Sequence, residues 1–324
     1  MEISVVVAAG KLSEDLYRLL RSLEEQILKP REIVIVAPRG CGEAVNLIDG
    51  VGIEVRVIEL PRDPGPIRAR ILGALSARSP LVAFIDSDCM APPDWLSSML
   101  SEMLSYSVDV VVGSVEGINV ESFISRLQER SLISPNPKFG YAKLLRGDLG
   151  LNLVVTANML VKREILFEEA VIPPSYGKFG FEDLDFIHRI LKRGYVVLCS
   201  PVRVYHFNRV ELASVIRRYY EYGRGLPYFR RSSANSFYSL VITVLLYSLL
   251  AVLAAGLTAL AIGKLLEGIL ALSLLLLPFY SHHLPRLNDG GLERFIYPPL
   301  ELLLAISSAL GALRSELALY RAGT

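Results

Sequence analysis

The sequence predicts an α/β domain with a mostly parallel sheet and flanking helices, followed by an all-α transmembrane region. Up to about residue 232, short apolar runs rich in β-branched residues alternate with helical patterns, which is typical of α/β sheets. The charges thin out after that point. Of the 67 charged residues, 57 precede Phe237 and only 10 lie in the 88 residues from there to Thr324. We therefore divide the sequence into a charged head, which precedes Phe237, and an apolar tail from Phe237 onward.

The head begins with a regular alternation of strands and helices. We expect strands over Ile3 to Ala9, Glu32 to Ala37, Ile53 to Leu60 and Leu81 to Asp86, and helices from Ser13 to Leu23 and from Ile67 to Ser76. In open α/β sheets, ligands bind at the carboxyl ends of the strands. Side chains that directly follow Ile85 are therefore well placed for chemistry.

The second half of the head is less regular. A stretch from Ser131 to Gly150 is rich in Pro, Gly and basic residues, and we expect it to be mobile. Around it we expect a helix over Asp94 to Ser105, a strand over Val108 to Val112, an apolar run over Leu153 to Val161, a helix over Leu184 to Lys192 and a strand over Val196 to Cys199.

The tail predicts a membrane domain over residues 233–324, after a first domain over 1–232. Its first run, 237–263, is uncharged and longer than the roughly 20 residues that a helix needs to cross a bilayer. A second span is expected over 265–281. A third candidate, 295–313, contains Pro298, Pro299 and Glu301, and it is a span if Glu301 finds a partner and an interfacial helix otherwise.

The charges and the cysteines of the sequence indicate where the protein lies in the cell and which kinds of partner it binds. Basic residues crowd the entrance to the first span, so the positive-inside rule predicts a multi-pass protein of the cell membrane with a cytoplasmic head. The net charge of +1 argues against a nucleic-acid partner. Cys41, Cys89 and Cys199 form neither a disulfide framework nor a structural zinc motif. The N-terminal run lacks a basic n-region and is expected to be a strand, not a signal peptide.

Two acidic clusters carry the predicted chemistry. Asp86 and Asp88 follow a buried strand, where carboxylates two residues apart can converge on Mg²⁺ or Mn²⁺ with substrate phosphates completing the shell. Glu182, Asp183 and Asp185 open a helix, and the helix dipole alone explains part of that cluster. Apolar neighbours nevertheless favour one of these carboxylates as a general base at a cleft wall.

Several motifs in order resemble family 2 glycosyltransferases, which have the GT-A nucleotide-sugar-binding fold. The resemblance covers the head from Ile3 to about Gly225. It rests on the first strand and helix, Gly65-x-x-x-Ala-Arg70, Phe84-Ile-Asp-Ser-Asp-x-x-x-Pro-Pro-x-Trp-Leu, Thr156-Ala-Asn-Met-Leu-Val, Glu182-Asp-x-Asp-Phe-x-x-Arg-x-x-x-x-Gly-Tyr and Val204-Tyr-His206. A single one of these motifs is weak evidence, whereas the ordered series is specific.

The resemblance implies roles for these residues. Asp183 would be the catalytic base of an inverting transfer, and Asp86, Asp88 and His206 would hold the divalent metal. The donor, a nucleoside-diphosphate sugar, would be bound with help from Arg70, Asp86, Ser87, Glu182, Arg217, Arg218 and Arg224. For the last three arginines, charges that set membrane topology are an equally good interpretation. The acceptor would be a lipid-linked or membrane-proximal glycan, with membrane lipids as further partners.

The sequence also departs from the family pattern, which leaves alternatives open. The usual aspartate after the second strand is absent, so Glu59 or Asp63 would have to replace it, and the base is not identified. A transferase acting on a polyprenyl phosphate is one alternative. Another is a binding subunit that has lost catalysis, and a transporter or channel is a third. The intact Asp86, Asp88 and Asp183 favour an enzyme.

Overall fold

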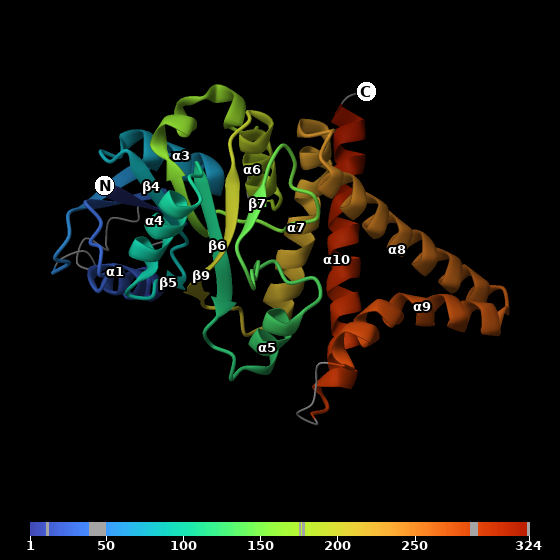
Figure 1. Ribbon diagram of the computed structural model, residues 1–324. Helices are drawn as coiled ribbons and strands as arrows, with labels where there is room; N and C mark the ends of the chain where they lie inside the picture. The colour runs from blue at the N-terminus through green and yellow to red at the C-terminus, as the bar shows by residue number, and fades with distance from the viewer. Residues whose placement is uncertain (11–12, 39–49, 175, 177–178, 286–290, 323–324) are drawn as a thin grey trace. The chain divides into compact units, whose positions relative to one another are not determined.

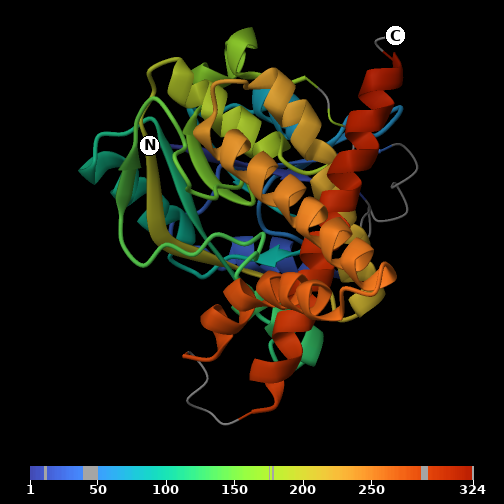
Figure 2. The same ribbon diagram turned by 90° about the vertical axis from the view of Figure 1, so that its right-hand side faces the viewer.

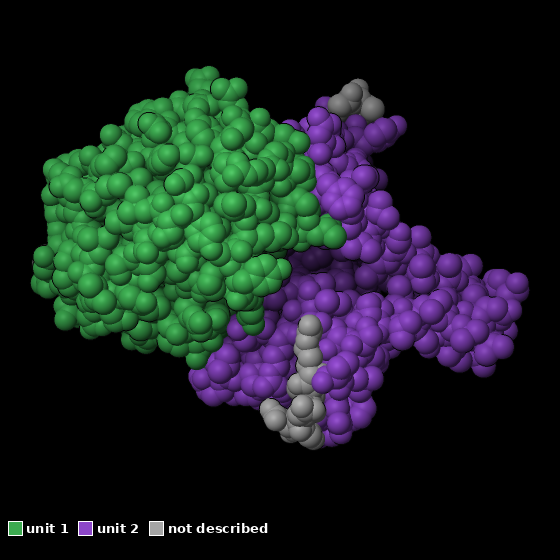
Figure 3. Space-filling model, in the orientation of Figure 1, with its two compact units in different colours: residues 1–119, 136–178, 182–208 green, residues 120–135, 179–181, 209–324 purple. Residues whose placement is uncertain are grey.

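The computed structural model describes residues 1–322 apart from 11–12, 39–49, 175, 177–178 and 286–290. The chain divides into two compact units, which Figure 3 shows in different colours. Unit 1 comprises residues 1–119, 136–178 and 182–208. Unit 2 comprises residues 120–135, 179–181 and 209–324. Each unit is described separately below.

Unit 1 is built on a nine-stranded mixed sheet in the order β3-β2-β1-β4-β8-β6-β9-β5, with β7 beside β9. Strands β3, β2, β1 and β4 are parallel, β8 runs antiparallel between β4 and β6, and β6 and β9 are again parallel. The strands are β1 (Ile3–Ala8), β2 (Glu32–Pro38), β3 (Val55–Leu60), β4 (Leu81–Ile85), β5 (Cys89–Met90), β6 (Val110–Gly117), β7 (Lys143–Leu145), β8 (Asn158–Lys162) and β9 (Val197–His206).

Side-chain alternation along β1 supplies cores on both faces of the sheet. Val5 and Val7 share a cluster with leucines of α1 (Glu14–Glu24) and with Trp95 at the start of α4 (Trp95–Ser105). Val6 points to the other face, where α3 (Pro66–Ser76) packs. There a Cβ on Gly73 would lie 2.5 Å from a methyl group of Val6, so only glycine lets α3 approach this closely. The parallel half is therefore covered on both sides (Figure 1).

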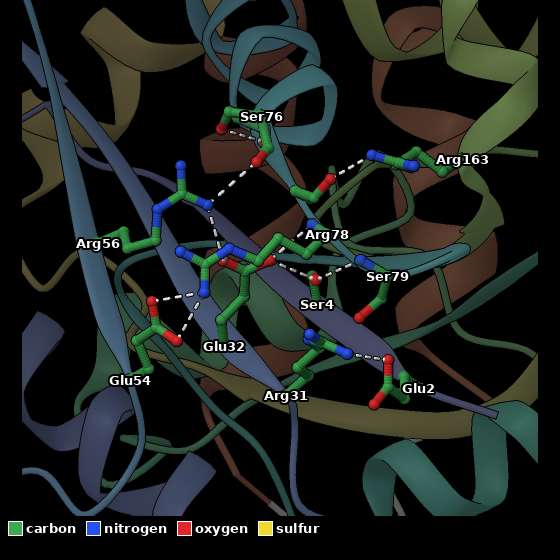
Figure 4. A network of polar contacts seen from close by, with 12 residues as sticks. Glu2, Ser4, Arg31, Glu32, Glu54, Arg56, Ser76, Arg78, Ser79 and Arg163 are labelled. Carbon is green, nitrogen blue, oxygen red and sulfur yellow. Dashed lines mark hydrogen bonds and ion pairs between the residues drawn. The ribbon is translucent and has the colours of Figure 1, made fainter.

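A polar network closes the amino ends of these strands (Figure 4). The buried Glu32 carboxylate accepts hydrogen bonds from the Ser4 hydroxyl (2.9 Å), the Arg78 backbone N–H (2.6 Å) and the Arg56 guanidinium (2.7 Å). Burial alone would raise the pKa of Glu32, but the bonds from Arg56, Arg78 and Ser4 lower it below its ordinary value. This end of the sheet is closed by polar contacts, and the carboxyl ends lie at the opposite edge.

Unit 2 is helical. It contains α5 (Phe123–Arg130), α7 (Leu212–Ser232), α8 (Phe237–Ala261), α9 (Leu265–His283) and α10 (Glu293–Ala322). Helices α8, α9 and α10 are long and apolar enough to cross a membrane, which confirms the three predicted apolar helices. In Figures 1 and 2, α8 and α9 form a hairpin whose open end meets α10, with α9 returning to the N-terminal half of α10.

The structure corrects several predicted element bounds. Strand β6 begins two residues later than expected and continues to Gly117, and β9 continues past Cys199 to His206. Helix α6 (Glu182–Lys192) begins two residues before the expected Leu184, so that Glu182 and Asp183 belong to its first turn. Within the apolar run over 153–161, the strand begins only at Asn158. Cys89 and Cys199 are buried free thiols, while Cys41 lies outside the described residues.

Candidate active site

The carboxyl ends of β4 and β9 and the first turn of α6 contribute the titratable side chains of the site. Asp86, Ser87 and Asp88 form the turn between β4 and β5, which is pinned by a Cys89 N–H to Asp86 carbonyl bond of 3.1 Å. Strand β5 pairs antiparallel with β9, and this register places Cys89 opposite His206. Asp88 and His206, which are 118 positions apart in the sequence, therefore become neighbours.

Arg70 joins the two acidic clusters. This α3 side chain is 6% exposed, and its guanidinium forms an ion pair with the Asp86 carboxylate while a second nitrogen lies 3.6 Å from Oδ1 of Asp183. Burial lowers the pKa of Arg70, but the charges of Asp86 and Asp183 raise it above its ordinary value, so it stays a cation. The site is thus organised around one buried positive charge between two carboxylates.

The Asp183 carboxylate is held and yet remains accessible. Oδ1 accepts a 2.7 Å hydrogen bond from the hydroxyl of Thr156, which is fully buried just before β8. The side chain of Asp183 is 29% exposed. Thr156 and Arg70 both approach Oδ1, so they fix the orientation of the carboxylate that is predicted to accept a proton. The sequence motif contained Thr156 without indicating this contact.

Burial and the neighbouring charged side chains shift the pKa values of Asp86 and His206. Burial raises the pKa of Asp86, Arg70 lowers it, and Asp88 and Asp183 raise it again, so the net shift is upward. Burial lowers the pKa of His206, but its bond to Asp88 and the charges of Asp88 and Asp86 together raise it above its ordinary value. Nε2 of His206 lies 3.3 Å from Oδ2 of Asp88, and Nδ1 lies 3.1 Å from Oδ1 of Asn208. Asn208 orients the imidazole in the way that is usual for metal-ligating histidines.

The donor set fits a divalent metal with two protein ligands. Asp88, 46% exposed, and His206, 22% exposed, present a carboxylate oxygen and an imidazole nitrogen side by side. Mg²⁺ and Mn²⁺ are commonly held by one or two protein ligands plus substrate phosphates. Among the residues that the structure describes, no three acidic, histidine or cysteine side chains gather closely enough to hold a metal by themselves. Asp86, engaged by Arg70, stays a predicted ligand.

The side chain of Glu182 points into the interior of unit 1. Its carboxylate, 2% exposed, accepts the backbone N–H of Ile67 at 3.3 Å and of Tyr176 at 3.2 Å. Burial raises the pKa of Glu182 to about 7, and the two backbone bonds oppose that shift. We assign Glu182 to holding the first turn of α3, which carries Arg70, against α6. Its predicted direct contact with the donor stays a prediction.

The remaining predicted donor residues lie in two different parts of the chain. Ser87 lies in the turn between the two aspartates. The three arginines belong to α7 in unit 2, where Arg217 and Arg218 are exposed, Arg218 lies over the Tyr222 ring, and Arg224 pairs with Glu221 and lies over Phe179. Their contact with a donor stays a prediction.

The two candidates for the missing nucleobase aspartate differ in their surroundings. Glu59 is exposed on β3, whereas Asp63 accepts the Gly65 N–H at 3.0 Å in the turn before α3. The segment that follows β2, residues 39–49, lies outside the described residues. Glu59 is therefore the side chain with more freedom to meet a ligand.

Comparison with known proteins gives a consistent result. The profile of Glycosyl transferase family 2 matches residues 4–168, just over half of the chain. The chain is 24% identical over 234 residues to the Pre-mycofactocin glycosyltransferase of Mycobacterium tuberculosis, an alignment that covers 68% of this chain and 46% of that protein. The chain thus spans about half the length of the curated relative it matches.

Solved structures share the fold. The mannosyltransferase PcManGT from Pyrobaculum calidifontis, in complex with GDP-Man and Mn²⁺, superposes with a TM-score of 0.63 at 17% identity, covering 96% of this chain and 87% of that one. S. aureus TarS 1–349 in complex with UDP-GlcNAc gives a TM-score of 0.54 at 15% identity, covering 98% and 92%. At these identities the likeness shows the GT-A fold.

Proposed function

Because the chain belongs to glycosyl transferase family 2, we propose that it is a membrane-anchored, metal-dependent inverting glycosyltransferase. It moves a sugar from a nucleoside-diphosphate sugar to a hydroxyl of a lipid-linked or membrane-proximal glycan. The observation that carries this proposal is the placement of Arg70 between Asp86 and Asp183. It brings the predicted base and the predicted diphosphate-binding turn into one site. The neighbours that hold GDP-Man and UDP-GlcNAc support a nucleotide-sugar donor.

The base step follows from the contacts of Asp183. An ionised carboxylate can take the proton of an acceptor hydroxyl as that oxygen attacks the anomeric carbon. Thr156 and Arg70 occupy the Oδ1 side, which leaves Oδ2 for the acceptor. Attack from the face opposite the leaving diphosphate inverts the configuration at the anomeric carbon. The same two contacts keep Asp183 in one orientation between turnovers.

Asp88 and the side chains near it would stabilise the leaving nucleoside diphosphate. Asp88 and His206 would hold Mg²⁺ or Mn²⁺, which would offset the charge on the departing nucleoside diphosphate. The side chain of Asp88 is the most exposed of the three aspartates, as a ligand shared with substrate should be. Arg70 supplies a fixed buried cation next to the same turn.

Cytoplasmic placement of unit 1 completes the proposal. Arg217, Arg218, Arg224, Arg230 and Arg231 precede α8, and basic residues next to a first span favour the cytoplasmic side. A donor made in the cytoplasm would then reach the site directly, and a membrane-anchored acceptor would lie at the adjacent bilayer surface.

Metal dependence gives the first test. We expect the purified full-length protein to release nucleoside diphosphate from one member of a nucleotide-sugar panel when Mn²⁺ or Mg²⁺ is present, and EDTA to abolish the release. Asp88→Asn should lower that activity at least about 100-fold, because it removes the charged metal ligand. Asp94→Asn, an exposed aspartate at the start of α4, is the matched control and should have no effect.

The outcomes of this experiment separate the alternatives. Turnover that is the same with EDTA, or in Asp88→Asn, would contradict the metal role. A thermal shift with nucleoside diphosphate and Mn²⁺ but no turnover with any donor and acceptor tried would instead indicate a binding subunit. Mass spectrometry of the lipid product distinguishes a sugar on a glycan from a sugar on a polyprenyl phosphate.

A further inference from the structure

Length and composition make α10 a candidate third span, but its packing within unit 2 ties both of its ends to elements that precede the first span. At the C-terminal end, Glu316 of α10 forms ion pairs with Arg230 at 2.8 Å and Arg231 at 3.5 Å, both in the last turn of α7. Helix α8 begins five residues after α7 ends. The C-terminal end of α10 is therefore at the entrance to the first span.

The N-terminal end of α10 is held in the same way. Glu293, its first residue, forms ion pairs with Arg126 at 2.9 Å and Arg130 at 2.7 Å, both on α5. One turn further on, Tyr297 packs against Phe123 with ring centroids 5.1 Å apart. Helix α5 lies more than 100 residues before α8 in the sequence. The N-terminal end of α10 is thus also fixed to a segment that precedes every candidate span.

Between its ends, α10 lies directly against α7. A Cβ on Gly311 would lie 2.1 Å from the carbonyl oxygen of Tyr220, and one on Gly223 would lie 1.8 Å from that of Ser308. The Ser307 and Ser308 hydroxyls bond to backbone carbonyls of α7 at 2.9 Å. Glycine at these crossings lets the two backbones touch. If α10 crossed the bilayer, α7 would enter the hydrocarbon core with it. The charged side chains of α7 would then lose their hydration, which costs free energy.

Glu301 has its partners inside unit 2. Its carboxylate is fully buried, lies 2.9 Å from Nε2 of His283 at the end of α9, and accepts the Leu132 backbone N–H at 3.2 Å. The acid therefore joins α9 to the segment that follows α5. The sequence predicts a third span if Glu301 finds a partner. Glu301 does have partners, but one of them is Leu132, in a loop that precedes α8, so its partners do not favour a span.

The surface left open on α10 matches a membrane interface. Leu310, Leu313 and Leu317 are 47%, 38% and 50% exposed, and Arg314 and Arg321 lie on the same stripe. These five positions follow the i, i+3, i+4, i+7, i+11 spacing of one helix face. An apolar stripe interspersed with arginines fits the boundary between acyl chains and anionic headgroups.

We propose that α8 and α9 are the only two spans among the described helices and that α10 lies along the bilayer surface on the side of α7. The charged turn with Lys264 and Glu267 then reaches the opposite side, because α8, with 25 residues, is about 37 Å long. The exposed stripe of α10 contacts anionic headgroups of the leaflet at which α8 begins. This arrangement of helices depends on one part of the proposed function, the anchorage of the chain in a membrane.

Site-directed labelling tests this arrangement. Single cysteines would replace Lys264 in the hairpin turn, Tyr320 near the end of α10 (69% exposed) and Ile27 in unit 1 (73% exposed). The background carries Cys41→Ser, since Cys89 and Cys199 are buried. A membrane-impermeant maleimide is added to intact cells and to inverted vesicles. We expect Lys264→Cys to react in intact cells, and Tyr320→Cys and Ile27→Cys only in inverted vesicles.

Two results would overturn the proposal. If Tyr320→Cys reacted together with Lys264→Cys in intact cells, α10 would be a span. If Lys264→Cys reacted only together with Ile27→Cys, the α8–α9 hairpin would not cross the membrane. Labelling of all three cysteines after solubilisation in a mild detergent, which keeps Cys89 and Cys199 buried, controls for their reactivity. The assay measures no sugar transfer, so its outcome is independent of whether the proposed reaction is correct.

Discussion

Asp183→Asn is expected to lower sugar transfer by about 100- to 10,000-fold, the range that general-base catalysis contributes. Asparagine keeps the size of the side chain and can still accept the Thr156 hydroxyl at its amide oxygen. It has no basic oxygen to take a proton from the acceptor. The loss should therefore appear in kcat, while the thermal shift produced by nucleoside diphosphate and Mn²⁺ stays close to that of the natural protein.

Thr156→Val provides a graded comparison for Asp183→Asn. It removes the hydroxyl that orients Asp183 and keeps the carboxylate, so the rate should fall less than it does in Asp183→Asn. If Asp183→Asn retained more than about a tenth of the activity, Asp183 would not be the base. A loss of nucleotide binding that matched the loss of transfer would instead place Asp183 in donor binding.

Arg70→Met is expected to have the largest effect on stability, about 3 kcal/mol of unfolding free energy. The guanidinium is 6% exposed and faces both Asp86 and Asp183, so its removal leaves two carboxylates without their counter-charge. We expect the lower end of the range for broken buried ion pairs, because these aspartates are 32% and 29% exposed and water compensates in part. Denaturant unfolding of the full chain in detergent measures the change.

Arg68→Met is the matched control for Arg70→Met. Arg68 is exposed on the same helix, so its replacement should change stability by less than about 0.5 kcal/mol. The double variant Arg70→Met, Asp86→Asn should recover part of the stability, because one unpaired charge is removed. If Arg70→Met were as stable as Arg68→Met, Arg70 would not be the electrostatic centre of the site.

The parallel half of the sheet could be predicted because its signal is local. The runs in β1, β2 and β4 are continuous and apolar, and the structure buries nearly all of these side chains. Helix α7 had no comparable signal. Its buried residues include Val215, Tyr219, Gly223 and Leu226, and glycine and tyrosine weaken the helical pattern that its contact with α10 stabilises. The arginines between these positions were visible in the sequence only as a basic cluster.

The candidate site was predictable in its residues and not in its contacts. Asp86, Asp88, Asp183 and His206 stand in motifs, whereas the approach of Arg70 to Asp183 depends on how α3 and α6 pack. The same packing turns Glu182 inward, to the N–H groups of Ile67 and Tyr176. A motif shows which residue types recur at a given spacing, but the direction in which a side chain points depends on partners that are distant in the sequence.

The stereochemistry of donor cleavage tests the central claim most directly. With an α-linked nucleotide sugar, Mn²⁺ and water as the acceptor, proton NMR in the first minutes identifies the anomer that is released before mutarotation mixes the two forms. Single displacement with Asp183 as the base predicts the β anomer first, and none above background from Asp183→Asn. Initial release of the α anomer would show retention of configuration and would contradict the mechanism proposed for this site.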